Sequence, residues 1–153
     1  MFHDNSKSRP SLPPSYFKKM EIHLKLTGVL LIILSMIHLI FPRYFDWRKE
    51  FLNVSHINRE MMYVHTFFIG LMVFLNGLLC LTSTNELINT VLGKRICFGL
   101  GIFWTTRLLI QFFGYSSIHW RGKKFETSMH VLFSFLWIYI SIVFFACYLQ
   151  FEI

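Results

Sequence analysis

Five polar side chains that could do chemistry lie inside otherwise apolar stretches of the sequence: His38, His65, Arg107, Gln111 and His130. Burying such groups in hydrocarbon is costly, so they normally face the interior of a helical bundle or a cavity. An imidazole can ligate a haem iron or a metal ion, and a guanidinium pairs with phosphate or carboxylate. The set is therefore suited to haem ligation, to metal binding, or to recognition of a lipid or quinone.

The apolar stretches around these residues are long enough to cross a membrane. A spanning helix needs about 20 mostly apolar residues, and the segments 24–41, 61–81, 96–114 and 129–149 meet that requirement. The runs are continuous rather than alternating, which indicates helices and not strands. The sequence therefore predicts an all-α membrane protein, a four-transmembrane-helix bundle over residues 23–150, with a flexible polar N-terminal tail over residues 1–22.

The composition agrees with this fold class. Apolar residues make up 54% of the chain and charged residues 15%, below the usual quarter. We assign the net charge of +7 to basic residues at the membrane interfaces and expect no nucleic acid partner. The basic cluster before the first span favours a cytoplasmic N-terminus. Cys80, Cys97 and Cys147 lie within spans without CxxC spacing, and we interpret them as small apolar residues.

The connectivity of four antiparallel spans places all five polar residues in one leaflet. His38 lies near the end of the first span and His65 near the start of the second. Arg107 and Gln111 lie near the end of the third span, and His130 lies at the start of the fourth. The first and third loops must be on the same side of the membrane. We therefore expect one polar cluster at that end of the bundle.

Helical phase adds three side chains to this candidate site. At about 100° per residue, Trp104 shares a face with Arg107 and Gln111, and Trp137 shares a face with His130. Asn76 belongs to the stripe that His65 begins on the second span. Small residues spaced by four on the third span would let another helix approach closely: Gly93, Cys97, Gly101 and Thr105. We expect Trp104, Trp137 and Asn76 to line the same ligand-binding site.

The two halves of the sequence share a spacing pattern. Trp47-Arg48 follows His38 by nine residues, and Trp120-Arg121 follows Gln111 by nine residues. This pattern predicts two parallel helical-hairpin repeats related by a rotation about the membrane normal. The loop 42–58 mixes aromatic and charged residues, which predicts a short helix in the headgroup layer.

The four short spans, with Phe41-Pro42-Arg43 leading to Trp47-Arg48, give the chain a family resemblance. It resembles small four-helix bacterial membrane proteins of the DoxX-like kind, and uncharacterised families that share such runs. The resemblance covers most of the chain in the number and length of spans. It implies a four-helix fold in a bacterial inner membrane, and it transfers no catalytic residue.

We expect a non-enzymatic protein, either an accessory subunit of a membrane complex or a module that binds a lipid or quinone. No phosphate loop, GxGxxG, HExxH or GxSxG motif occurs in the sequence. The expected partners are membrane lipids and either other membrane subunits or a second copy of the chain. The alternative is a membrane redox protein. A haem b would need two imidazoles on facing helices, and a metal ion would need the three histidines His38, His65 and His130 to converge.

Overall fold

The computed structural model describes residues 13–114 and 124–151, and six helices account for most of them. They are α1 (Pro14–Tyr44), α2 (Trp47–Glu50), α3 (His56–Thr82), α4 (Thr84–Asn89), α5 (Val91–Phe113) and α6 (Lys124–Leu149). The segments Pro14–Tyr44, His56–Thr82, Val91–Phe113 and Thr127–Leu149 are long and apolar enough to cross a membrane. The protein is therefore an integral membrane protein built on four transmembrane helices, as the sequence predicts.

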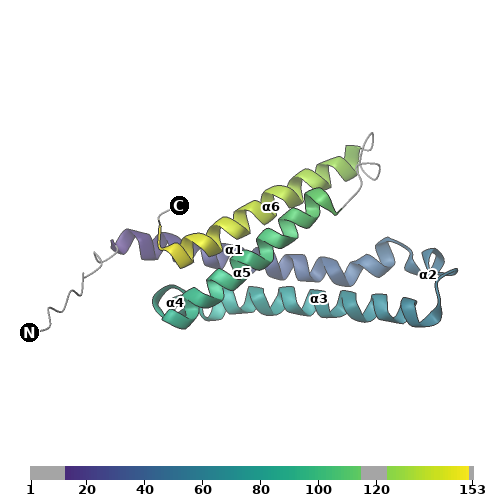
Figure 1. The fold of residues 1–153 in the computed structure, drawn as a ribbon, viewed down its shortest axis with the longest axis horizontal. Helices are drawn as coiled ribbons and strands as arrows, with labels where there is room; N and C mark the ends of the chain where they lie inside the picture. Colours follow the sequence, from purple (N-terminus) through teal and green to yellow (C-terminus); the bar gives the residue numbers. More distant parts are fainter. Residues whose placement is uncertain (1–12, 115–123, 152–153) are drawn as a thin grey trace, which may run out of the picture.

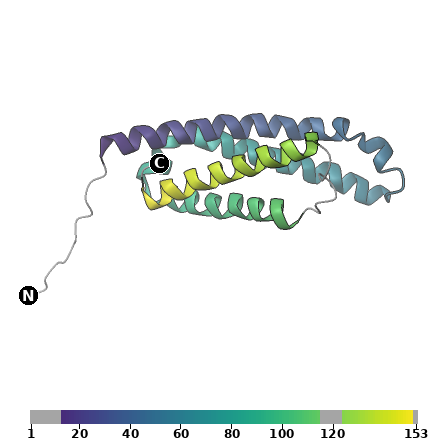
Figure 2. The ribbon, with the colours of Figure 1, turned by 90° about the horizontal axis from the view of Figure 1, so that it is seen from above.

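The four long helices pair as two antiparallel hairpins, α1 with α3 and α5 with α6 (Figure 1). The hairpins meet at the end that holds α4, here called the closed end. There α1 contacts α6, and α4 contacts α5. The hairpins diverge toward the end that holds α2, here called the open end (Figure 1). The view from above shows the long helices running along a common direction (Figure 2). Consecutive hairpins are what the repeat interpretation requires, and their superposition stays a prediction.

Glycine allows α1 and α3 to approach each other closely. Gly28 and Gly77 face each other across the helix pair, and a methyl group on either would lie 2.9 Å from the other's carbonyl oxygen. Toward the open end, Gly70 of α3 lies beside the Cβ of His38. Small residues at a helix crossing are the usual means of packing backbones together inside a membrane.

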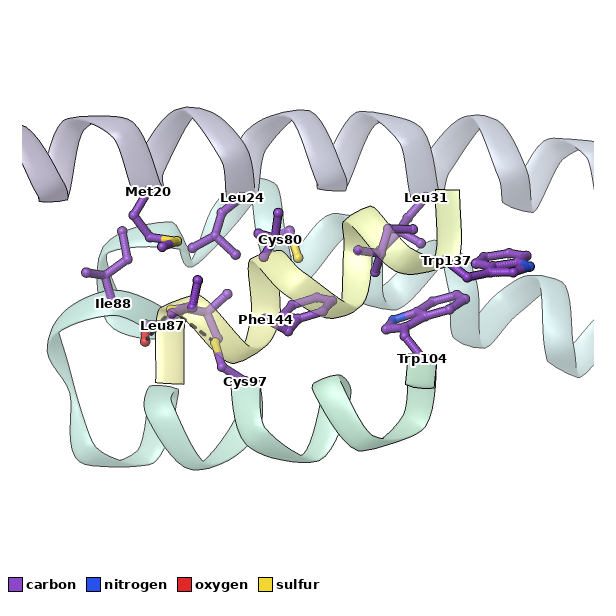
Figure 3. Packing of buried hydrophobic residues seen from close by; sticks show 14 of the residues in the cluster. Met20, Leu24, Leu31, Cys80, Leu87, Ile88, Cys97, Trp104, Trp137 and Phe144 are labelled. Carbon is purple, nitrogen blue, oxygen red and sulfur yellow. Dashed lines mark hydrogen bonds between the residues drawn. The ribbon is translucent and has the colours of Figure 1, made fainter. Parts of the chain in front are cut away.

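The core lies mainly at the closed end, around α6 (Figure 3). Residues on α6 that are wholly inaccessible include Ile140, Val143, Phe144, Ala146 and Cys147. Two polar contacts tie α1 to α6 there: the Tyr16 hydroxyl donates to the Ala146 carbonyl at 3.4 Å, and His23 Nδ1 lies 3.0 Å from the Tyr139 hydroxyl. The hairpins are thus joined by both apolar packing and hydrogen bonds.

The first helix begins earlier than the sequence suggested. It starts at Pro14, so residues 14–22 belong to α1 and not to a flexible tail, while residues 1–12 lie outside the described part. Tyr16, Met20 and Leu24 are buried at a spacing of four, whereas Lys18 and Lys19 are exposed. This segment is an amphipathic stretch of helix that packs on the core although its outer side is charged.

The structure also contains α4, a short helix that the sequence did not predict. Its Leu87 and Ile88 side chains are buried under the closed end of the bundle. α4 packs so tightly on the start of α5 that a methyl group at Gly93 would overlap the Glu86 carbonyl. The short helix predicted within residues 42–58 is present as α2, where Trp47 packs on Tyr63 of α3 with ring centroids 5.3 Å apart.

Candidate functional site

Arg107 and Gln111 form a polar pair on α5 inside the membrane-spanning segment. Their spacing of four puts them on one face of the helix, and Arg107 Nη1 donates to Gln111 Oε1 at 3.1 Å. Gln111 is only 6% exposed, whereas Arg107 is half-buried. The Arg107 guanidinium carbon also lies 5.2 Å from the centre of the Trp137 ring on α6. That distance is within the range of a cation–π interaction, which orients the charge across the hairpin.

Trp137 belongs to a stack of aromatic rings between α5 and α6. Its ring lies 5.1 Å from that of Trp104 with planes 13° apart, and 5.9 Å from that of Phe133 with planes 15° apart. The indole nitrogens of Trp104 and Trp137 have no hydrogen-bond partner among the described residues. Figure 3 shows these nitrogens at opposite ends of the stacked pair. A buried indole N–H usually finds an acceptor, so each marks a place where an acceptor atom would be stabilised.

His130 links the start of α6 to the end of α5. Its Nε2 donates to the backbone carbonyl of Gln111 at 3.2 Å, and its ring packs edge-on against Phe112 at 6.0 Å. Carbonyl groups in the last turn of a helix lack a partner within that helix, so His130 satisfies one of them. Arg107, Gln111, His130, Trp104 and Trp137 thus lie together, and we refer to these five of the predicted residues as the α5–α6 cluster.

His38 and His65 lie on the other hairpin. Each donates its Nδ1 hydrogen to the carbonyl four residues earlier, His38 to Leu34 and His65 to Met61, at 2.8 Å in both cases. His38 is half-buried and His65 is exposed. The α1–α3 hairpin diverges from α5 and α6 at this end (Figure 1), so the single cluster of five that we expected is divided. Membrane topology fixes the leaflet of a residue and leaves its lateral position open.

The predicted stripe on α3 is also only partly buried. Asn76 is 7% exposed and its Nδ2 has no partner among the described residues, whereas His65 is exposed. Across residues 13–114 and 124–151, no three histidine, cysteine, aspartate or glutamate side chains are placed to hold a metal ion. The three histidines therefore do not converge on one metal, as the metal alternative required.

The α5–α6 cluster lies where α5 packs on α6, toward the end of α5. Two shallow surface hollows lie elsewhere, one around Lys94, Arg95 and Tyr148 and one around Arg43 and Arg48. Neither is lined by the cluster.

One polar contact between the hairpins was missed from the sequence. His23 meets Tyr139 at the closed end, and it lies one residue before the predicted span 24–41. Spacing along the sequence gives no signal for this contact, because it joins two helices at residues that are 116 positions apart.

Comparisons of the chain with protein-family models, with curated proteins and with solved structures found no match. The geometry of α5 and α6 therefore carries the functional inference.

Proposed function

We propose that this integral membrane protein is a non-enzymatic binding module for an anionic lipid, whose phosphate or carboxylate head is held by the α5–α6 cluster. The observation that carries the proposal is the placement of Arg107 within a membrane-spanning helix, oriented by Gln111 at 3.1 Å and by the Trp137 ring at 5.2 Å. The cost of an arginine is about 3 kcal/mol at the very centre of a spanning helix on insertion scales, and Arg107 lies between the centre and the end of α5. Such a residue is a strong candidate for a functional role.

The chemistry of the cluster favours an anion over a neutral ligand. A guanidinium presents a planar fork of donors that matches phosphate or carboxylate oxygens in pairs. Arg107 lies six residues before Phe113, the last residue of α5, which corresponds to about 9 Å along a helix. A guanidinium at that depth can reach toward the interface along its aliphatic stem. The acyl chains of a lipid would then lie against exposed apolar side chains of α5 and α6, among them Phe103, Phe135 and Ile138.

Lipid binding by the purified full-length protein tests this proposal. Native mass spectrometry in detergent would count bound phosphatidylglycerol and phosphatidylcholine on the wild type and on Arg107→Leu, Arg107→Lys and Arg95→Leu. Arg95 is the matched control because it is an exposed arginine near the opposite end of the same helix. Circular dichroism would establish that each variant is folded.

We expect the wild type and Arg95→Leu to prefer phosphatidylglycerol by about tenfold, which corresponds to about 1.4 kcal/mol. Arg107→Lys should keep part of the preference because it keeps the charge, and Arg107→Leu should lose it. Equal lipid preference in the wild type and Arg107→Leu would exclude the proposal. If a short-chain quinone binds equally well to the wild type and to Arg107→Leu, the proposed ligand becomes a neutral molecule and not an anionic lipid.

A haem protein is the second candidate, and one observation favours it. His38 and His65 both donate Nδ1–H to a backbone carbonyl, which in a neutral imidazole leaves Nε2 as the atom that can ligate a metal. They lie on paired helices toward the same end of the bundle. An absorption spectrum and iron analysis of the purified protein decide this candidate, since a Soret band lost in His38→Ala would support it. Substoichiometric iron without such a band would exclude it.

A further inference from the structure

We propose that Cys97 and Cys147 are a redox modification site at which a disulfide bond forms between α5 and α6. The two thiols are 50 residues apart in sequence, yet their Sγ atoms lie 3.3 Å from each other. Both are wholly buried in the closed end of the bundle. A disulfide bond is about 2.0 Å long, so the sulfurs need to approach each other by only roughly 1.3 Å to form it.

The packing of α5 on α6 fixes this proximity. A methyl group at Gly101, one turn beyond Cys97, would lie 3.0 Å from the Phe145 ring of α6, so the helices are already in close contact. On the other side, Cys147 Sγ lies 3.6 Å from the Leu87 carbonyl of α4. Figure 3 shows Cys97 beside Leu87 at this end of the core. The thiol pair is therefore held between three elements, α4, α5 and α6.

The third cysteine provides an internal comparison. Cys80 on α3 is also wholly buried and belongs to the same core. The contact at 3.3 Å joins Cys97 with Cys147, so this pair should react together and leave Cys80 as a thiol. In the sequence all three resemble small apolar residues of a span, because spacing along the chain does not reveal a contact between helices.

The oxidant that fits a buried pair is a small uncharged peroxide that enters membranes. Hydrogen peroxide converts one thiol to a sulfenic acid and releases one water. The second thiol then attacks that sulfur, and the S–S bond forms. The hydroxyl of the sulfenic acid leaves and takes up the thiol proton to give the second water. The net reaction consumes two thiols and one peroxide and yields one disulfide and two waters. A dithiol reductant reverses it by exchange.

Peptide mapping of the full-length protein tests the proposal. The protein in lipid vesicles is treated with hydrogen peroxide, denatured, alkylated at the remaining thiols and digested with trypsin without reduction. Cleavage at lysine and arginine places each cysteine in its own peptide, within residues 60–94, 96–107 and 125–153. The three possible pairs therefore have different masses. Cys97→Ala and Cys147→Ala are the test variants, and Cys80→Ala is the matched control.

We expect the linked 96–107 and 125–153 peptides in the wild type and in Cys80→Ala, with Cys80 alkylated in the wild type. Cys97→Ala and Cys147→Ala should give no linked pair, and dithiothreitol should remove the link from the wild type. Three alkylated cysteines after peroxide treatment, or a linked pair that contains Cys80, would overturn the proposal. The wild-type map decides the outcome even where a variant fails to fold.

Discussion

Gly28 of α1 and Gly77 of α3 lie so close that either glycine leaves no room for a side chain on the other. A Cβ at Gly77 would lie 2.9 Å from the Gly28 carbonyl oxygen and 2.9 Å from the Ile32 side chain. The obstacle on one side is backbone, which cannot rotate away as a side chain can. The α1–α3 hairpin is therefore held by direct contact between two backbones.

Gly77→Ala should destabilise the protein by about 1–3 kcal/mol, because overpacked contacts force the helices apart. The matched control is Gly99→Ala on α5, where an added Cβ meets nothing within 4 Å. That substitution should be neutral or stabilise the helix by up to about 1 kcal/mol. Unfolding in increasing mole fractions of dodecyl sulfate, followed by circular dichroism, measures both. Equal stability of the two variants would contradict the close approach.

Trp104→Ala should lower the free energy of unfolding by about 3–5 kcal/mol, since the substitution removes a large side chain from a packed core. Trp104 is 2% exposed and stacks on Trp137, whereas Phe113 at the end of the same helix is 85% exposed. Phe113→Ala should therefore stay within about 0.5 kcal/mol of the wild type. The same unfolding measurement compares them. If Trp104→Ala lowers the free energy of unfolding no more than Phe113→Ala does, the aromatic stack adds little to the stability of the bundle.

Tyr139→Phe should lower the free energy of unfolding by about 1 kcal/mol, because it removes the hydroxyl that lies 3.0 Å from His23 Nδ1. This contact joins the two hairpins, so its loss should also lower the protection of α1 amides against hydrogen exchange. Tyr148→Phe, at an exposed tyrosine on the same helix, serves as the control and should change neither quantity. If Tyr139→Phe behaves like Tyr148→Phe, the contact between α1 and α6 is not stabilising.

Four spans predict that both ends of the described chain lie on one side of the membrane. Cysteines introduced at Ser15 and Gln150 should therefore react with a membrane-impermeant maleimide from the same side, and a cysteine at Asn53 from the opposite side. The native cysteines are wholly buried and give little background. Labelling of Ser15→Cys from the cytoplasmic side would agree with the orientation that the basic N-terminal cluster predicts. Opposite sidedness of Ser15 and Gln150 would contradict the four-span topology.

The fold was largely predictable because each spanning helix must satisfy its own backbone hydrogen bonds within an apolar run. The predicted span 61–81 lies within α3, which extends from His56 to Thr82. The start of α1 was harder to predict, because Lys18 and Lys19 lower the hydropathy of a turn whose inner side is buried. α4 was missed because a helix of 6 residues gives no periodic signal.

The candidate site was predictable within a helix and less so between helices. The spacing of four between Arg107 and Gln111 directly predicts their contact. The position of Trp137 over Arg107 depends on the axial register of α5 and α6, which helical phase supports but does not determine. The separation of His38 and His65 from the cluster depends on the angle between the hairpins. That angle depends on the packing of α4 and on the contacts of α1 with α6 at the closed end, which are properties of the folded chain.

The divergence of the two hairpins from α4 toward α2 gives the protein a wedge shape (Figure 1). A wedge occupies more area in the leaflet at its open end than in the leaflet at its closed end. The surrounding bilayer therefore bends with least strain when the leaflet that holds the open end is on the convex side. We therefore expect the protein to concentrate on strongly curved membrane whose outer leaflet holds the open end. Tubules drawn from vesicles would reveal this enrichment, and the direction of curvature would report which way the bundle is inserted.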